Sequence, residues 1–122
     1  MKVAVLGASD KPERYSFKAM QMLAQHGHAT FPVHPKLRTL LGRPVVASLS
    51  DVAESVDTVT VYVSPDKVAA LLPELLGLAP RRVIFNPGSE DPASMSALRD
   101  AGIHVVEACT LVLLRTQQFD TA

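Results

Sequence analysis

The feature that most limits the possible folds is a set of short runs rich in β-branched residues, two of which are apolar throughout. Residues 3–6 read Val-Ala-Val-Leu and residues 83–85 read Val-Ile-Phe, so neither run has a polar residue to face solvent. Strands of this kind are typical of a parallel sheet that helices cover on both faces. The chain is therefore expected to form an α/β fold.

Five such runs predict strands, and the intervals between them have helical spacing. The predicted strands are residues 2–6, 29–33, 58–63, 82–86 and 103–107. Their first residues lie 21 to 29 positions apart, as in βαβ units with right-handed crossovers. The predicted helices are residues 15–26, 65–76 and 92–101, with a shorter helical turn near residues 50–53.

Boundary residues agree with these helices. Gly27 follows the first helix, Ser64 and Pro65 open the second, and Asp91 is a candidate N-cap for the third. No repeat, low-complexity tract or linker divides the chain. We therefore predict a single domain over residues 1–122, a Rossmann-like, doubly wound, mainly parallel five-stranded sheet with helices on both faces. Its ligand should lie beyond the carboxyl ends of the strands.

Composition narrows the class of partner. Of the 122 residues, 48% are hydrophobic and 20% are charged, which suits a folded domain rather than a disordered chain. The net charge is zero, aromatic residues make up 5% and Trp is absent, so no nucleic-acid partner is expected. Cys109 is the only cysteine, which excludes an internal disulfide and suggests a reducing compartment. The first apolar run ends at Gly7, too early for a signal peptide or a membrane span, so we expect a cytoplasmic protein without a membrane partner.

The zero net charge conceals an asymmetry. Residues 1–45 carry seven basic and two acidic side chains, and the remaining residues carry five basic and ten acidic ones. A basic half on a neutral chain favours a local anion site over a long polyanion, although an unevenly charged solvated surface would give the same count.

The loop between the first predicted strand and the first predicted helix has the features of an anion site. In a Rossmann-like fold, free backbone N–H groups and the positive end of the helix dipole converge there. The candidate binding residues are Gly7 for close backbone approach, Ser9 and Ser16 as hydroxyl donors, and Lys11 and Arg14 for charge. The loop is neither a G-x-G-x-x-G fingerprint nor a P-loop, and an ordinary strand-to-helix turn is the alternative.

The end of the second predicted strand carries a cation at a position where NAD-binding domains usually have an acid. Pro35 and Lys36 follow that strand, and Arg38 and Arg43 add to the positive field. A cation there attracts a phosphorylated ribose, so coenzyme A or NADP is favoured over NAD. An unliganded surface lysine is the alternative for Lys36.

Two further loops are expected at the same edge of the sheet. Val63 and Ser64 lead into the second predicted helix, and Asn86, Pro87 and Gly88 follow the fourth predicted strand. The Asn-Pro-Gly-Ser run should make a tight turn with free amides, suited to a base or an elongated ligand tail. A purely structural turn is equally consistent with these residues.

An ordered set of motifs over nearly the whole chain resembles a known family. The motifs are Gly7-Ala8-Ser9, Arg14-Tyr15-Ser16, the Pro-Val-His-Pro-Lys run at 32–36, the Leu-Gly-Arg-Pro-Val run at 41–45 and the Gly-Ile-His-Val-Val run at 102–106. Together they resemble the stand-alone bacterial CoA-binding domain proteins. They are also similar to the N-terminal CoA-binding domain of the succinyl-CoA synthetase alpha subunit.

This resemblance implies a position for each part of coenzyme A. The first loop, now including Ala8 and Tyr15, would hold the phosphates. Pro35 and Lys36 would lie by the 3′-phosphoadenosine end. Val63-Ser64 and Asn86-Pro87-Gly88 would flank the adenine and the pantetheine.

The residues give no sign of a reaction centre. His26, His28, His34 and His104 lie in no recognisable metal-ligand or nucleophile pattern, and no paired acid or Ser-His-Asp arrangement is apparent. The phosphohistidine of succinyl-CoA synthetase belongs to a further domain, for which 122 residues leave no room. We therefore expect no catalytic and no metal-binding residues.

The primary hypothesis is a small cytoplasmic protein that binds coenzyme A or an acyl-CoA without catalysing a reaction. One alternative is an enzyme that uses NADP or another nucleotide. Another is a regulatory or interaction protein with a vestigial pocket, in which the apolar residues 111–114 form the contact of a homodimer. Cys109 is either a buried structural residue or a thiol placed to form a mixed disulfide with coenzyme A.

Overall fold

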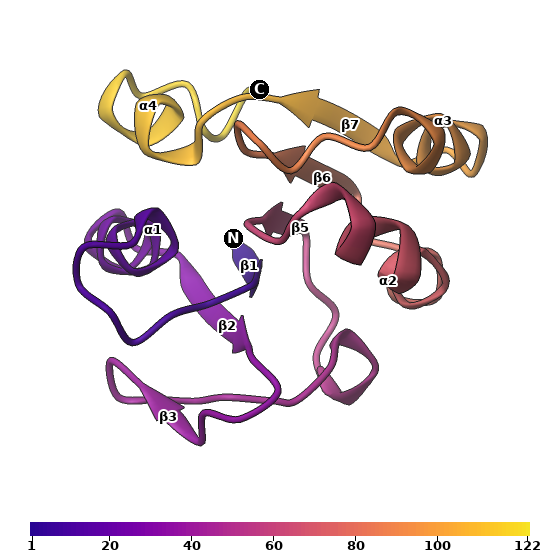
Figure 1. Cartoon of the computed structure of the whole chain (residues 1–122). Helices are drawn as coiled ribbons and strands as arrows, with labels where there is room; N and C mark the ends of the chain where they lie inside the picture. The colour runs from indigo at the N-terminus through magenta and orange to yellow at the C-terminus, as the bar shows by residue number, and fades with distance from the viewer.

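Five parallel strands form one sheet in the order β2-β1-β5-β6-β7 (Figure 1). The structure is a computed structural model that describes residues 1–122. The strands are β1 (Lys2–Leu6), β2 (Ala29–Val33), β5 (Thr58–Val61), β6 (Arg82–Phe85) and β7 (His104–Glu107). This parallel sheet confirms the predicted Rossmann-like α/β class. The strand order reverses between β1 and β5, and ligands of such sheets bind beside that reversal.

Helices cover both faces of the sheet. They are α1 (Tyr15–Gln25), α2 (Pro65–Leu78), α3 (Pro92–Asp100) and α4 (Thr110–Arg115). Figure 1 shows α1 and α4 on one face, and α2 and α3 on the other. None of these helices has both the length and the apolarity needed to cross a bilayer.

Alternate residues of the apolar strands serve two separate cores. Val3 and Val5 of β1 pack with the residues of α1 and α4, whereas Ala4 and Leu6 pack with those of α2 and α3. All four are buried. A run without polar residues is therefore what this central strand needs, because each of its faces meets a helical layer.

A small hairpin follows β2 and leads back towards the sheet. It pairs β3 (Thr39–Leu40) with β4 (Arg43–Pro44), and Val46 then bridges Val33 at the end of β2. A short 3-10 turn, η1 (Leu49–Asp51), takes the place of the helical turn predicted near residues 50–53. The hairpin lies along β2, which is an edge strand of the sheet.

The predicted boundaries are correct to within two residues, and the differences have local causes. The strand predicted over 58–63 ends at Val61, and beyond it the Val63 side chain packs closely on Gly7. The helix predicted over 65–76 continues to Leu78, where Ala79 ends it in the left-handed region with φ of 50°. The other helices and the last two strands are shorter than predicted by one residue.

The C-terminal apolar run does not form the free surface that an oligomer contact requires. Residues 111–114 lie in α4, where Leu111, Leu113 and Leu114 are buried and the last two pack with α1 and the sheet. Only Val112 of this run is exposed. The three leucines complete the core of their own chain, so Val112 is the only residue of this run that remains for the predicted homodimer contact.

The opposite, amino edge of the sheet is closed by a buried arginine. Arg82 at the start of β6 donates from Nε to the Thr58 hydroxyl at 3.0 Å. It also donates from Nη1 to the carbonyl oxygens of Phe119 and Ala122. Its guanidinium lies over the Phe119 ring, 4.5 Å from the centroid. These contacts fix the last residues of the chain to the sheet, far from its carboxyl edge.

Candidate functional site

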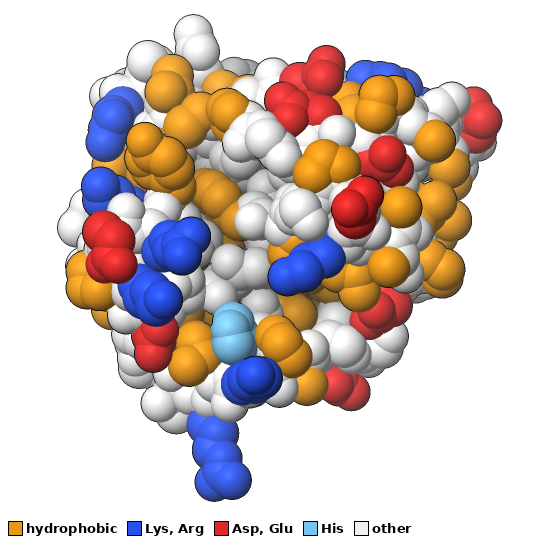
Figure 2. Space-filling view, viewed as in Figure 1, with side chains coloured by type: hydrophobic (Ala, Val, Ile, Leu, Met, Phe, Trp, Pro, Cys, Tyr) orange, Lys and Arg blue, Asp and Glu red, His pale blue; other side chains and the backbone are white.

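A cleft of about 870 Å³ opens at the carboxyl edge of the sheet, where β1 and β5 end. Its walls are the loop after β1, the end of β2, the segment before η1, the start of α2 and the loop after β6. Figure 2 shows a hollow on this face of the molecule with basic side chains on both sides. The predicted binding residues that line the cleft are Gly7, Ala8, Ser9, Lys11, Arg14, Tyr15, Ser16, Pro35, Val63, Ser64, Asn86, Pro87 and Gly88. Lys36 is the one predicted residue that does not line it.

Gly7 makes the turn out of β1 at the point of closest approach to β5. Its φ is +87°, in the region that favours glycine. A Cβ atom placed there would lie 2.9 Å from Cγ1 of Val63 and 3.1 Å from the backbone carbon of Tyr62. The N–H groups of Gly7 and Ala8 both point to the Val33 carbonyl oxygen, at 3.3 and 3.2 Å. These two amides are therefore engaged within the protein, and the expected free donors must come from the helix that follows.

The first turn of α1 provides such donors. Arg14 occupies the N-cap position, its side chain makes no capping bond, and no acidic residue lies in the first turn. The N–H groups at the start of this helix thus have no side-chain acceptor, and Tyr15 and Ser16 of this turn line the cleft. Lys11 and Arg14 are exposed beside them. An uncapped helix N-terminus with adjacent cations is suited to a phosphate group.

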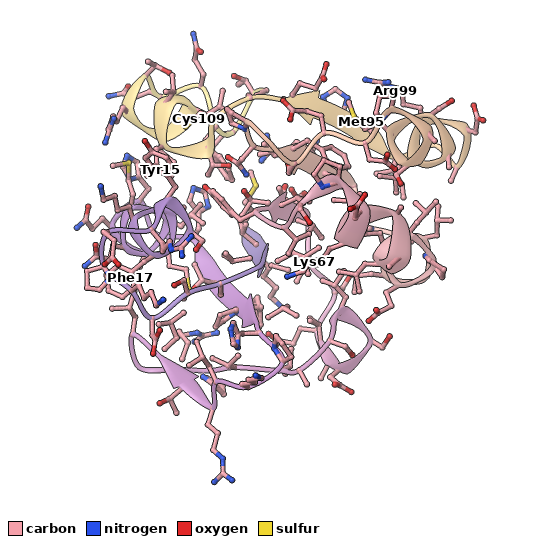
Figure 3. All side chains as sticks on the ribbon, viewed as in Figure 1. Tyr15, Phe17, Lys67, Met95, Arg99 and Cys109 are labelled. Carbon is pink, nitrogen blue, oxygen red and sulfur yellow. The ribbon has the colours of Figure 1, made fainter.

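A second helix begins on the other side of the cleft. Ser64 is the N-cap of α2 and makes no side-chain capping bond; unlike α1, this helix has a proline at its first position and an acidic residue, Asp66, in its first turn, which does not line the cleft. One turn further, Lys67 extends from α2 towards the space between α2 and the β1 loop (Figure 3). Lys67 was not among the predicted site residues, because a single lysine in the first turn of a helix looks like a solvated surface residue. Asp10 is the only acidic residue in the lining, against three cations.

His34 organises the loop after β2, in which Lys36 lies outside the cleft. Its Nδ1 accepts hydrogen bonds from the N–H groups of Lys36 and Leu37, at 3.0 and 3.1 Å. These bonds tighten the loop after β2, so His34 and Pro35 line the cleft while Lys36 is exposed beyond its rim.

The loop after β6 lines the cleft, but its polar groups are largely occupied. The Asn86 side chain is buried and donates to the Thr60 hydroxyl and the Val61 carbonyl, at 2.7 and 3.0 Å. Its oxygen accepts from the Thr110 N–H at 2.8 Å, at the start of α4. The Gly88 N–H donates to the Glu90 carboxylate. Asn86 thus joins β5, β6 and α4, and the free amides expected in this turn are partly used.

Tyr62 also lines the cleft and was not predicted. Its phenol oxygen is buried and makes no hydrogen bond of ordinary geometry, and the nearby hydroxyls of Thr60 and Thr110 bond to each other at 2.8 Å. Burial raises the pKa of Tyr62 to about 12.

Cys109, at the N-cap of α4, is half-buried and does not line the cleft. Nowhere in the chain do three His, Cys, Asp or Glu side chains come together as possible metal ligands.

Comparisons with known proteins agree with this architecture. A family model described as a CoA binding domain matches residues 1–115. A solved structure of an uncharacterized protein is 39% identical with a TM-score of 0.91, and the match covers 97% of each chain. A Thermus thermophilus structure is 36% identical with a TM-score of 0.89, covering 97% of this chain and 90% of the other. The uncharacterized protein YneT of Bacillus subtilis (strain 168) is 29% identical over 75 residues, which are 62% of this chain and 56% of YneT.

Proposed function

Since this chain belongs to the CoA binding domain family, we propose that it binds coenzyme A or an acyl-CoA in the cleft at the carboxyl edge of its sheet. The protein would sequester, sense or present the cofactor without catalysing a reaction. The observation that carries this proposal is the pair of uncapped helix N-termini, on α1 and α2, that face each other across the reversal point of the sheet. Anionic phosphates are the ligand groups that such donors favour.

The charges of the lining support a position for the diphosphate. Lys11 and Arg14 stand at the α1 end, and Lys67 approaches from α2. A diphosphate between the two helix ends would meet cations from both walls of the cleft. Each charge-assisted hydrogen bond of this kind contributes roughly 1.5–3 kcal/mol.

The remaining lining favours one direction for the rest of the ligand. Val63, with Leu49 and Leu71 of the same wall, offers an apolar surface to a flat base. Pro35 and the exposed Lys36 at the rim would then lie near the 3′-phosphate of the adenosine. The pantetheine would run past Tyr62 towards Pro87 and Gly88, which are exposed at the other end of the cleft.

Thermal unfolding with a ligand panel tests the proposal. The panel is coenzyme A, dephospho-coenzyme A, acetyl-CoA, NADP and NAD. A ligand present at 100 times its Kd should stabilise the fold by about 2.7 kcal/mol. Stabilisation by coenzyme A that weakens without the 3′-phosphate supports the proposal. A shift with NADP alone would instead favour a nucleotide-dependent enzyme, and no shift with any of the five would contradict ligand binding.

Charge-removal variants test the contribution of Lys67. Lys67→Ala should weaken coenzyme A binding about tenfold, and dephospho-coenzyme A by the same factor, because the diphosphate is common to both. Lys36→Ala should affect only coenzyme A. Lys18→Ala is the matched control, because Lys18 lies in α1 with its ammonium over the Tyr15 ring and does not line the cleft. Equal effects of the Lys18 and Lys67 variants would show that only the overall charge matters.

A further inference from the structure

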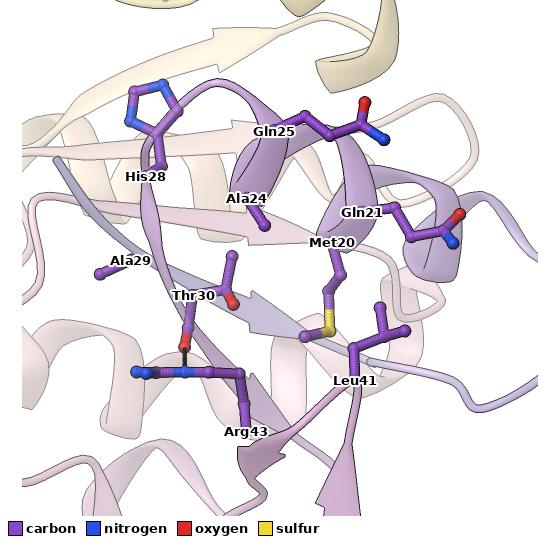
Figure 4. Close-up of a pocket in the computed structure, with 9 residues that line it drawn as sticks. All are labelled: Met20, Gln21, Ala24, Gln25, His28, Ala29, Thr30, Leu41 and Arg43. Atoms are coloured by element: carbon purple, nitrogen blue, oxygen red, sulfur yellow. Dashed lines mark hydrogen bonds between the residues drawn. The ribbon is translucent and has the colours of Figure 1, made fainter.

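A second cavity, separate from the cleft, lies between α1, β2 and the β3–β4 hairpin (Figure 4). Its volume is about 310 Å³, within the range of small-molecule sites. It shares no lining residue with the cleft at the carboxyl edge of the sheet. Four of its nine lining residues are hydrophobic and none is acidic.

Arg43 provides a fixed cation on one side of this cavity. Its Nε donates to the Thr30 carbonyl oxygen at 2.9 Å, and its guanidinium lies over the Phe31 ring, 5.3 Å from the centroid. Neither terminal nitrogen is paired with a carboxylate or another protein acceptor. These two contacts hold the guanidinium plane in place and leave its terminal nitrogens available to a planar anion, such as a carboxylate.

Leu41 provides an apolar wall at an energetic cost. It has a φ of 49° and precedes Gly42 with a φ of 75°, so the hairpin turn has the two positive φ values for which Asn-Gly is usual. Its side chain is nevertheless 46% exposed. Met20 of α1 lies beside it but is only 1% exposed, so the accessible apolar surface is completed by Ala24 and Ala29, which are exposed (Figure 4). In the isolated chain, the half-exposed Leu41 side chain buries little apolar surface to offset the cost of its backbone conformation. An apolar group that covered Leu41 would bury more of this surface and so stabilise the complex.

We propose that this cavity binds a short aliphatic carboxylate. The carboxylate would accept hydrogen bonds from the Arg43 guanidinium, and the hydrocarbon chain would lie against Leu41, Ala24 and Ala29. Both parts of the ligand are required, because the cation alone would select any small anion and the apolar wall alone would select any small hydrocarbon. The proposal does not depend on coenzyme A binding.

A titration monitored by two-dimensional NMR tests it on the intact chain. The probes are hexanoate, acetate and 1-hexanol, with backbone amide and arginine Nε–H signals recorded for each. Hexanoate should shift the Arg43 Nε–H and the amides of Thr30 and Leu41, and it should bind at least about tenfold more tightly than either of the other probes. Equal binding of hexanoate and acetate, equal binding of hexanoate and hexanol, or shifts confined to the residues of the cleft would each overturn the proposal.

Two variants separate binding from folding. Leu41→Asn keeps Arg43 and suits the positive φ, so it should raise the unfolding temperature while weakening hexanoate about tenfold. Arg43→Lys keeps the charge but loses the planar fork, so it should also weaken hexanoate while leaving 1-hexanol unchanged. Unaltered hexanoate binding in Leu41→Asn would contradict the proposal even if Arg43→Lys failed to fold. Stabilisation by coenzyme A should be the same in Leu41→Asn and in the natural chain, which keeps this test distinct from that of the cleft.

Discussion

At the scale of single residues, the cleft depends on the absence of a side chain at Gly7. Gly7→Ala should be destabilising twice over, through its positive φ and through collision with Val63 and the Tyr62 backbone. Gly27→Ala is the matched control, since Gly27 has a similar φ of +83° but nothing within 4 Å of the added Cβ. In urea denaturation, Gly27→Ala should cost about 1 kcal/mol and Gly7→Ala at least about twice as much. Similar losses in both variants would show that the close approach of β1 and β5 is unimportant.

Tyr62 gives a prediction that depends on pH. Burial raises the pKa of its phenol from 10.0 to about 12, so the folded state disfavours the phenolate. The unfolded chain therefore loses this proton first as the pH rises, and stability should fall between about pH 10 and 12. Tyr62→Phe should reduce this fall and remove the tyrosinate absorbance that develops near pH 12. It should cost little stability at neutral pH, because the phenol oxygen has no partner to lose.

At the scale of secondary-structure elements, α4 is a core element that presents one apolar residue to solvent. Leu113 is 8% exposed and packs with α1, whereas the adjacent Val112 is 49% exposed. Leu113→Asp should bury an unpaired carboxylate and cost more than about 4 kcal/mol, while Val112→Asp should cost less than about 1 kcal/mol. Circular dichroism and chemical denaturation would measure both effects. Comparable losses would mean that the exposed side of α4 is itself covered, for example by a second copy of the chain.

The five strands of the sheet and the helices α1, α2 and α3 were predictable from sequence because their signals are local, whereas α4 and the β3–β4 hairpin were not predicted. The apolar run of β1 and the Ser64-Pro65 pair that begins α2 are both signals that can be recognised from a few consecutive residues. The Asp91 N-cap is also confirmed, since its carboxylate accepts from the Ser94 N–H. The ends of elements were less predictable, because they depend on distant partners. β5 ends at Val61, and the close packing of Val63 on Gly7 beyond that end is a contact that no local pattern shows.

The site was predictable only where a loop carries its own signature. The loops after β1 and β6 were identified through glycine, proline, polar and basic residues, with Ala8 and Tyr15 added by the family resemblance, and all of their predicted members line the cleft. Lys67, Tyr62 and Leu49 were missed, since each is an ordinary helix, strand-end or core residue until the fold brings it to the lining. Lys36 was predicted as the cation for a phosphorylated ribose, but it does not line the cleft as its neighbour Pro35 does, and the bonds from the N–H groups of Lys36 and Leu37 to His34 are not visible in the sequence.

At the scale of the whole molecule, the carboxyl edge of the sheet is open and the amino edge is closed. The carboxyl edge leaves two helix N-termini uncapped around an open cleft. The amino edge is closed, since Arg82 is fully buried and its donors meet Thr58, Phe119 and Ala122. Stability can therefore be changed at one edge without altering the groups that would meet a ligand at the other.

Arg82→Met tests this separation. It keeps an apolar side chain of similar length but leaves the carbonyl oxygens of Phe119 and Ala122 without their donor, which should cost about 2–4 kcal/mol. Arg81→Met is the control, because it removes the same charge from the preceding residue. The Arg81 side chain is 53% exposed and paired with Asp57, so its loss should lower the free energy of unfolding by less than about 1 kcal/mol. Urea denaturation with and without coenzyme A would measure both. The coenzyme A increment should be equal in the two variants and in the natural chain, because neither arginine approaches the cleft. A smaller increment in Arg82→Met alone would mean that closure of the amino edge also shapes the ligand site.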